Sequence, residues 1–243
     1  MLLNGEAIYV KDEINNRLYV AAKDLKSNEL ILMEFADGEL TRIDTNGLKL
    51  KPVNIIVNED SEKLLIVGKK DNLLLDRTNP KNSILMDQPF DTANVIWNPS
   101  NNRLFLREGS GSEVAVFDTL TGEKIDRSGT GRAGVKFGKF LASVAFSVVQ
   151  YNLGYVGVAY GRTSTEMMLN GSEDKLYVIN TKTNDVTHFN ASDLSDRKAI
   201  ATGSGTSLIY RHINHDDSLF VLSSNKANII NDKDFTKDLK KVI

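Results

Sequence analysis

A glycine-rich segment is the most recognisable chemical motif of the sequence. Gly129-Thr130-Gly131-Arg132-Ala133-Gly134 has the spacing G-x-G-x-x-G, in which backbone amides can cradle the pyrophosphate of a dinucleotide. That function requires a buried parallel strand before the motif and a helix after it. Here a polar strand predicted at 123–125 precedes the motif, and another predicted strand follows it. We therefore expect a loop between strands, with no dinucleotide or other cofactor.

A second group of residues has the donor types of a metal site. His212, His215, Asp216 and Asp217 lie close together and could supply nitrogen and oxygen ligands. However, this segment aligns with the polar segments at 58–61 and 98–101, each of which leads into an apolar strand. We expect a solvated turn here and no metal site.

The remaining histidine lies in a more polar stretch of the chain. His188 falls within a strand that we expect on the outer side of its sheet. We therefore expect His188 at the surface.

Hydrolytic chemistry lacks its usual signatures in this sequence. There is no G-x-S-x-G elbow and no H-E-x-x-H helix. Glycoside hydrolysis needs two carboxylates across the sugar bond, and the carboxylates expected near one mouth of the fold are Glu6, Asp87 and Asp91. Other inner strands supply none at the matching position. We expect no catalytic residues and a protein that is not an enzyme, with a glycosidase as a less favoured alternative.

The composition is that of an ordinary globular protein. Of the 243 residues, 41% are hydrophobic and 26% are charged, which excludes a disordered chain. Lys+Arg is 30 and Asp+Glu is 32, and a net charge of -2 argues against specific nucleic-acid binding. Because the chain has 0 Cys, disulfides and thiolate metal sites are excluded.

No segment has the pattern of a targeting or membrane sequence. Residues 1–6 lack the basic start and apolar core of a secretory signal. The longest charge-free stretch, 140–161, contains Gln150, Asn152, Gly154 and Gly157, and we interpret it as two buried strands around a turn. We expect a cytoplasmic protein, or one assembled in the cytosol, without membrane contact.

A short pattern recurs along the chain: a polar turn, then Leu, then apolar or aromatic residues. Copies occur at 15–20, 61–67, 101–106 and 216–221, with a degenerate copy at 152–156. Leu18, Leu64 and Leu104 are 46 and 40 residues apart, and Leu219 follows after two further repeats. A period of about 40–50 residues made only of strands is typical of β-propeller blades. We expect these leucines at equivalent buried positions of second strands.

Each copy of the pattern has similar neighbours, which predict four strands per repeat. First strands are expected at 7–10, 53–57, 93–97, 142–146 and 207–210. Third strands are expected at 30–33, 73–75, 114–117, 176–179 and 229–230, and more polar fourth strands at 39–44, 83–86, 123–125, 186–189 and 240–243. The fold class is therefore all-β: a single propeller domain of five four-stranded blades, approximately 6–45, 53–87, 93–127, 142–190 and 206–243.

The turn expected between third and fourth strands has repeated chemistry. Residues 117–122 align with 179–184 without a gap. Asp118 and Asn180 can accept hydrogen bonds from amides two residues on. Gly122 and Asn184 stand where a left-handed residue would close the hairpin.

These segments resemble known repeats. Residues 114–125 resemble the hairpin of YVTN-type and quinoprotein-like β-propeller repeats, and residues 98–106 are similar to the turn and second strand of such repeats. The resemblance implies a propeller and carries no catalytic residue, because these motifs are structural. Trp97 is the only Trp, so the tryptophan pattern of quinoproteins is absent and a quinone cofactor is not expected.

The absence of catalytic signatures favours a non-catalytic scaffold or interaction protein that presents loops to protein partners. The most variable loops are expected at 126–139, 161–174 and 193–205. Asn is abundant alongside Lys and Ile, which indicates an AT-rich source. Together with the start at Met1, this composition favours a structural subunit of a larger assembly, such as a phage particle.

The alternative is a lectin-like propeller that binds carbohydrate. Sugar sites need aromatic rings and convergent hydrogen bonds, usually repeated in every blade. The candidate rings lie inside predicted inner strands and are expected in the core: Tyr9, Trp97, Phe146 and Tyr210.

One face of the propeller is expected to be basic. Each connection from a second to a third strand carries a basic residue near its start, and the loop after Asp126 adds more. Nearby acids, including Asp24 and Asp71, neutralise part of this charge. The predicted partner-binding face consists of Lys23, Lys69, Arg107, Arg132, Lys136, Arg162 and Lys226. It would meet an acidic partner, an anionic surface or a glycan, with attraction that falls as salt rises.

Overall fold

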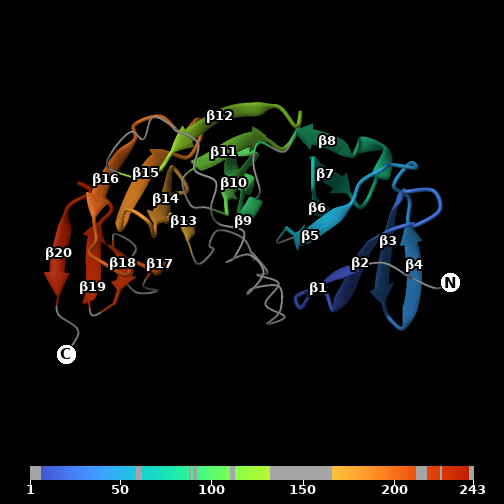
Figure 1. The fold of residues 1–243 in the computed structure, drawn as a ribbon, viewed down its shortest axis with the longest axis horizontal. Helices are drawn as coiled ribbons and strands as arrows, with labels where there is room; N and C mark the ends of the chain where they lie inside the picture. The colour runs from blue at the N-terminus through green and yellow to red at the C-terminus, as the bar shows by residue number, and fades with distance from the viewer. Residues whose placement is uncertain are drawn as a thin grey trace. The chain divides into compact units, whose positions relative to one another are not determined.

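The residues that the structure describes fold into five antiparallel sheets of four strands each, and every sheet is built from consecutive strands (Figure 1). A computed structural model describes residues 7–58, 62–87, 89, 92–109, 113–131, 166–211, 218–224 and 226–240. Within these ranges the chain forms β-strands joined by turns and loops. The two helices there are single-turn 3-10 helices, at Pro80–Asn82 and Pro99–Asn101. The all-β prediction is confirmed.

The strands of each sheet follow one another along the chain. The first sheet contains β1 (Ile8–Asp12), β2 (Arg17–Lys23), β3 (Leu30–Ala36) and β4 (Glu39–Ile43). The second contains β5 (Pro52–Val57), β6 (Lys63–Gly68), β7 (Asp71–Asp76) and β8 (Ile84–Asp87), and the third β9 (Thr92–Asn98), β10 (Arg103–Glu108), β11 (Glu113–Asp118) and β12 (Lys124–Gly129). The fourth contains β13 (Met167–Leu169), β14 (Lys175–Asn180), β15 (Asp185–Asn190) and β16 (Lys198–Ala201), and the fifth β17 (Leu208–Arg211), β18 (Ser218–Ser223), β19 (Lys226–Asn231) and β20 (Lys237–Lys240).

The sheets form two compact units, and within each unit neighbouring sheets pack face to face. The first unit holds the β1–β4 and β5–β8 sheets, whose shared core includes Tyr19 and Leu64. In the second unit, Phe105 and Leu176 lie in the core of the third and fourth sheets, and residues such as Leu219 lie in the core of the fourth and fifth. The fourth sheet is therefore covered on both faces, which explains the unbroken apolar run at 176–179.

Four of the five predicted sets of strands match the structure. The first, second, third and fifth sheets contain the expected strands, within a few residues at their ends. Burial falls toward the fourth strand as expected, since four of the five residues in β4 are exposed, whereas β6 and β7 are almost wholly buried.

The predicted strand positions in the fourth sheet were wrong. The segment 176–179 was expected as a third strand, but it belongs to β14, the second strand of its sheet. The segment 186–189 lies in the third strand, β15, and β16 is the fourth. The turn at 180–184 therefore joins a second strand to a third, unlike the turn at 118–122. The predicted strands at 142–146 and 152–156 lie outside the described residues.

The repeat has a copy that the sequence analysis overlooked. Ser172-Glu173-Asp174-Lys175-Leu176-Tyr177-Val178 has the same polar turn, basic residue and Leu as the copy at 15–20. Leu176 lies 72 residues after Leu104 and 43 before Leu219, so the extra chain length falls before β13. The strands of the fourth sheet were predicted at the wrong positions because this insertion lengthened the spacing between two copies of the repeat.

Three of the four repeated leucines are buried in second strands, as predicted. Leu64, Leu104 and Leu219 have no exposed surface. Leu18 is only half-buried, and the next residue, Tyr19, takes the core position in β2. Residues alternate between the two faces of a strand, and Leu18 lies on the face of β2 that points away from the core shared with the β5–β8 sheet, in which Leu64 is buried.

Asparagine closes several of the turns that separate these strands. Asn16 and Asn102, which precede the basic residue of the repeat, have φ of 50° and 55°, a left-handed conformation that Asn tolerates better than most residues. Gly122 and Asn184 are also left-handed, with φ of 75° and 52°, as expected. The Asn180 side chain accepts a hydrogen bond from the Lys182 amide at 3.0 Å, as expected.

A pair of variants at Asn102 tests this turn. Asn102→Ala is expected to lower the free energy of unfolding by about 1 kcal/mol, because the left-handed conformation brings Cβ too close to the carbonyl oxygen. Asn102→Gly, which removes that clash, is expected to stay within about 0.5 kcal/mol of the parent. Urea unfolding of both variants provides the measurement, and equal losses would contradict this account.

None of the helices in the described part of the chain has the length and apolar character needed to cross a bilayer. The charge-free stretch at 140–161 lies outside the described residues.

Candidate functional site

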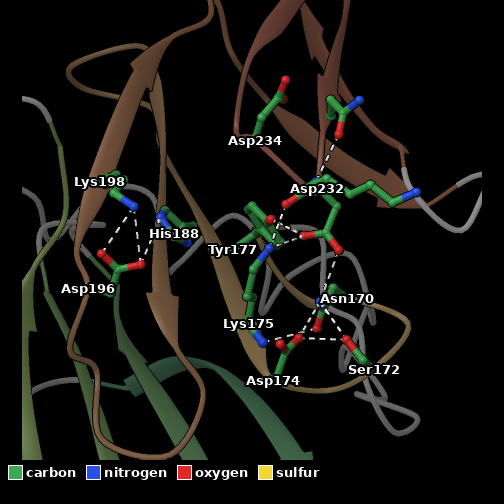
Figure 2. A network of polar contacts seen from close by, with 12 residues as sticks. Asn170, Ser172, Asp174, Lys175, Tyr177, His188, Asp196, Lys198, Asp232 and Asp234 are labelled. Carbon is green, nitrogen blue, oxygen red and sulfur yellow. Dashed lines mark hydrogen bonds and ion pairs between the residues drawn. The ribbon is translucent and has the colours of Figure 1, made fainter.

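A network of polar side chains lies where the fourth and fifth sheets meet, inside the second unit (Figure 2). Its residues come from β14 and the turn before it, from β15, β16 and the turn between them, and from the turn between β19 and β20. Figure 2 shows Lys175, Tyr177 and Asp232 directed toward one another.

Two carboxylates are held by one amide group. Asn170, which is buried, donates through Nδ2 to Asp174 Oδ1 at 2.6 Å and to Asp232 Oδ2 at 3.0 Å. Its Oδ1 accepts the Lys175 backbone amide at 3.0 Å, which fixes the orientation of the side chain. Hydrogen bonds from the Ser172 hydroxyl and from Asn170 lower the pKa of Asp174, so Asp174 is ionised at neutral pH.

Asp232 connects the fifth sheet to the fourth. Its carboxylate accepts a hydrogen bond from the Tyr177 hydroxyl and lies 3.3 Å from Lys175 Nζ. Burial, together with the hydrogen bond to Asp232, raises the pKa of Tyr177 well above its ordinary value. The phenol therefore remains protonated and acts as a donor, not as a base.

His188 lies beside this network and is buried, so its prediction as a surface residue was wrong. Its ring stacks on Tyr177 with centroids 6.0 Å apart, and the Phe235 ring lies at 4.5 Å. Neither ring nitrogen has a hydrogen-bond partner among the described residues. The physical reason for the burial is Phe235, which reaches His188 from the fifth sheet and is 47 residues away in sequence.

The network is better suited to joining two sheets than to catalysis. No cluster of three or more His, Cys, Asp or Glu residues suited to a metal occurs in the described residues. The carboxylates of Asp174 and Asp232 are occupied by Asn170, Lys175 and Tyr177, and His188 has no nucleophile within hydrogen-bonding distance in the same part of the chain. The predicted metal group at His212, His215, Asp216 and Asp217 lies outside the described residues.

The glycine motif has a structural role in the residues that can be described. The Gly131 amide donates to Thr187 Oγ1 at 2.8 Å, and the Gly131 carbonyl accepts from Arg197 Nη2. Gly131 has φ of 99°, and a Cβ there would meet Thr183 Oγ1 at 3.0 Å. The first half of the motif is thus packed into the protein and is not an open phosphate cradle. Residues 132–134 lie outside the described residues.

The structure describes four of the seven residues of the predicted basic face. Lys69 and Lys226 are exposed and Lys23 is half-buried, whereas Arg132, Lys136 and Arg162 lie outside the described residues. Arg107 is 1% exposed, so its prediction as a surface residue was wrong. The role of the other six residues stays a prediction.

Arg107 is buried because it completes a polar contact between the third and fourth sheets. It forms an ion pair with Glu166 through Nη1, and its Nη2 donates to the Ile179 carbonyl at 2.9 Å. Asn94 Nδ2 donates to the same Glu166 oxygen at 2.7 Å. Burial lowers the pKa of Arg107, and the nearby charge of Glu166 opposes that effect. The sequence analysis missed this contact, although an Arg inside an apolar strand was a visible signal.

The candidate carboxylates and aromatic rings are placed differently from expectation. Asp87 lies at the end of β8, the fourth strand of its sheet, while Glu6 and Asp91 lie outside the described residues. Trp97 is buried as expected, but Tyr9 and Tyr210 are 57% and 38% exposed, so their prediction as core residues was wrong. Phe146 lies outside the described residues.

Solved structures share this fold at low sequence identity. A periplasmic gluconolactonase of Pseudomonas aeruginosa, PpgL, aligns with a TM-score of 0.58 and 12% identity over 97% of this chain and 68% of that one. A functionally unknown protein from Desulfotomaculum acetoxidans gives a TM-score of 0.53 with 13% identity, over 99% and 71%. A streptogramin B lyase gives 0.50 with 10% identity, over 100% and 70%. No protein-family model matches the chain, and no curated protein matches it significantly.

These similarities support a propeller-type repeat fold, and they correct one prediction. The chain was expected not to be an enzyme, because catalytic motifs are missing and the repeats are structural. That expectation was wrong, because a gluconolactonase and a streptogramin B lyase share the fold. The fold therefore gives no reason to exclude catalysis. At 10–12% identity these two structures indicate the fold alone.

Proposed function

We propose that the chain is an interaction subunit of a larger assembly, such as a phage particle, and that it binds a protein partner through one face of its first sheet. In this proposal the five sheets are YVTN-type blades, and the partner covers the face of the first sheet on which a further blade would otherwise pack. The observation that carries the proposal is the apolar, exposed face of the β1–β4 sheet.

The two faces of the first sheet differ in their surroundings. On one face, residues such as Val10 and Tyr19 pack into the core shared with the β5–β8 sheet. On the other, Tyr9, Phe35 and Leu40 are 57%, 44% and 63% exposed. Large apolar side chains gathered on one surface favour a protein interface.

The exposed side chains form neighbouring rows across the four strands. Phe35 lies directly opposite Leu18 on β2 and Leu40 on β4. In the next row on the same face, Tyr9 pairs with Val20, which pairs with Met33. The rows give a continuous apolar surface, here called the open face: Tyr9, Leu18, Val20, Met33, Phe35 and Leu40.

Charge on the open face indicates the chemistry of the partner. The charged strand positions on this face are Lys11 and Arg42, both exposed. Glu34 points to the opposite face, where it accepts hydrogen bonds from Arg17 at 2.6 Å and Tyr19 at 3.3 Å. An apolar partner surface bordered by carboxylates would complement the open face.

Site-specific photo-crosslinking tests this function. A photoreactive phenylalanine analogue at position 35 is expected to capture one protein partner in cells that produce the chain. The same analogue at Leu85, a 53% exposed residue on β8, is the control and is expected not to capture it. The partner, identified by mass spectrometry, is then purified for binding measurements.

The purified partner allows a quantitative prediction. Leu40→Glu is expected to weaken its binding by about tenfold or more, because a buried carboxylate would replace an apolar contact beside the partner's own acids. Leu85→Glu is expected to leave the affinity within about twofold. Equal cross-linking from both positions, cross-links only within the chain or to another copy of it, or unchanged affinity for Leu40→Glu would contradict the proposal.

Carbohydrate binding is a second candidate, favoured by the exposed tyrosines. Tyr9 lies on the first strand of its sheet, as does Tyr210, and an exposed ring can stack on the apolar face of a sugar. A glycan array with the parent chain and Tyr9→Ala tests this function. Binding that is lost in Tyr9→Ala supports it, and an array without any binding rejects it.

A further inference from the structure

His188 is enclosed by three elements of the second unit. Tyr177 on β14 and Phe235 in the β19–β20 turn cover the ring from two sides. On the third side lies β16, where Lys198 pairs directly with His188 across the sheet, and the turn before it carries Asp196. Figure 2 shows the imidazole between Tyr177 and the pair formed by Asp196 and Lys198.

The imidazole is neutral at neutral pH. Burial is the largest effect and lowers the pKa of His188 below its ordinary value. Among the surrounding charges, Asp196 and Asp232 raise that pKa, whereas Lys198 and Lys175 lower it. Since neither ring nitrogen has a hydrogen-bond partner among the described residues, a proton gained by the ring would need a new acceptor.

Asp196 can provide that acceptor. Its Oδ1 and Oδ2 lie 3.2 and 3.3 Å from Lys198 Nζ, and the same Oδ2 lies 4.0 Å from His188 Nε2. The side chains of Asp196 and Lys198 are both 60% exposed, so their ion pair is weak and exchangeable. A shift of about one ångström would convert the long contact with His188 into a hydrogen bond.

We propose that Asp196 is an acid-operated switch that pairs with Lys198 at neutral pH and with the protonated ring of His188 in acid. A solvent proton binds Nε2, and the Asp196 carboxylate leaves Lys198 and accepts the new N–H. Asp196 has φ of 48°, so the turn at 191–197 is held in a left-handed conformation at the point that must move. The switch therefore couples the conformation of this turn to pH.

The same groups determine the direction of the pH effect on stability. The pKa of His188 is lower in the folded than in the unfolded chain, so the unfolded chain binds the proton first. Burial of the neutral ring contributes fully above an unfolded pKa of about 6.5. That contribution to stability falls as the pH drops from there toward the lower pKa of the folded chain. The hydrogen bond from the protonated ring to Asp196 limits the loss.

NMR titration of the full chain from pH 7.5 to pH 4.5 tests the switch. Imidazole 15N shifts follow protonation, and His188→Gln identifies the His188 signals among the three histidines. The amide shifts of residues 194–197 are expected to change with the same midpoint as the His188 ring. In Asp196→Asn the His188 midpoint is expected to fall, and the amide response at that midpoint is expected to disappear.

A neighbouring acid provides the matched control. The Asp193 side chain accepts the Ser195 amide at 2.9 Å, a bond that Asn can keep, so Asp193→Asn is expected to leave the His188 midpoint unchanged. Lys198→Met removes the neutral-pH partner of Asp196 and is expected to raise the midpoint. Three results would each overturn the switch: turn amides that respond equally in His188→Gln, a midpoint that Asp196→Asn does not lower, or a ring that stays neutral until the chain unfolds.

Discussion

Replacing Glu166 with Leu is expected to lower the free energy of unfolding by about 3 kcal/mol, because it leaves the Arg107 guanidinium buried without its ion-pair partner. Arg107 is 1% exposed, so water cannot compensate for the loss. About 3 kcal/mol is the low end for such a change, since the Glu166 side chain is itself 26% exposed.

The double variant Glu166→Leu/Arg107→Met distinguishes charge burial from packing. Removing both charges is expected to restore part of the stability lost by Glu166→Leu, since an apolar pair needs no desolvation of ions. Urea unfolding followed by Trp97 fluorescence measures each variant, because Trp97 is the only Trp and lies on β9 in the same unit. A double variant less stable than Glu166→Leu would contradict the explanation.

A more exposed ion pair provides the control. Arg103 and Asp118 lie on adjacent strands of the third sheet with Nη1 and Oδ2 2.8 Å apart. Asp118→Asn is expected to cost at most about 1 kcal/mol, because this pair is partly solvated and Asn occupies the aligned position at 180.

Truncating Leu104 to Ala is expected to lower the free energy of unfolding by about 2–5 kcal/mol. Leu104 is fully buried in β10, so the substitution removes apolar contacts and leaves a cavity. Trp97 fluorescence in urea again provides the measurement.

Leu120 supplies the matched exposed leucine. It lies in the turn after β11 and is 63% exposed, so Leu120→Ala is expected to stay within about 0.5 kcal/mol of the parent. Similar losses for the two variants would mean that the repeated leucine does not mark the core of the sheet.

The strands could be predicted because their signals are local. The turn residues Asn16 and Asn102 tolerate a left-handed backbone, and a basic residue and Leu follow each of them at the start of a strand. These signals depend only on neighbouring residues, so they indicated the strands of four sheets. They failed in the fourth sheet, where an insertion interrupted the spacing before β13.

The open face of the first sheet also escaped prediction. Tyr9 lies in an apolar strand, and its sequence context resembles that of a core residue. Its exposure depends on whether another sheet covers that side of β1, and periodicity along a single strand carries no information about a second layer.

The sequence by itself determined that this protein is made of short antiparallel strands with asparagine and glycine turns. The tertiary structure alone decided which polar residues became internal. Arg107 is buried because Glu166, 59 residues later, meets it inside the second unit, and His188 is buried because Phe235 covers it from another sheet. Alternation and turn chemistry act over a few residues, whereas burial depends on contacts between distant segments, which local sequence patterns do not reveal.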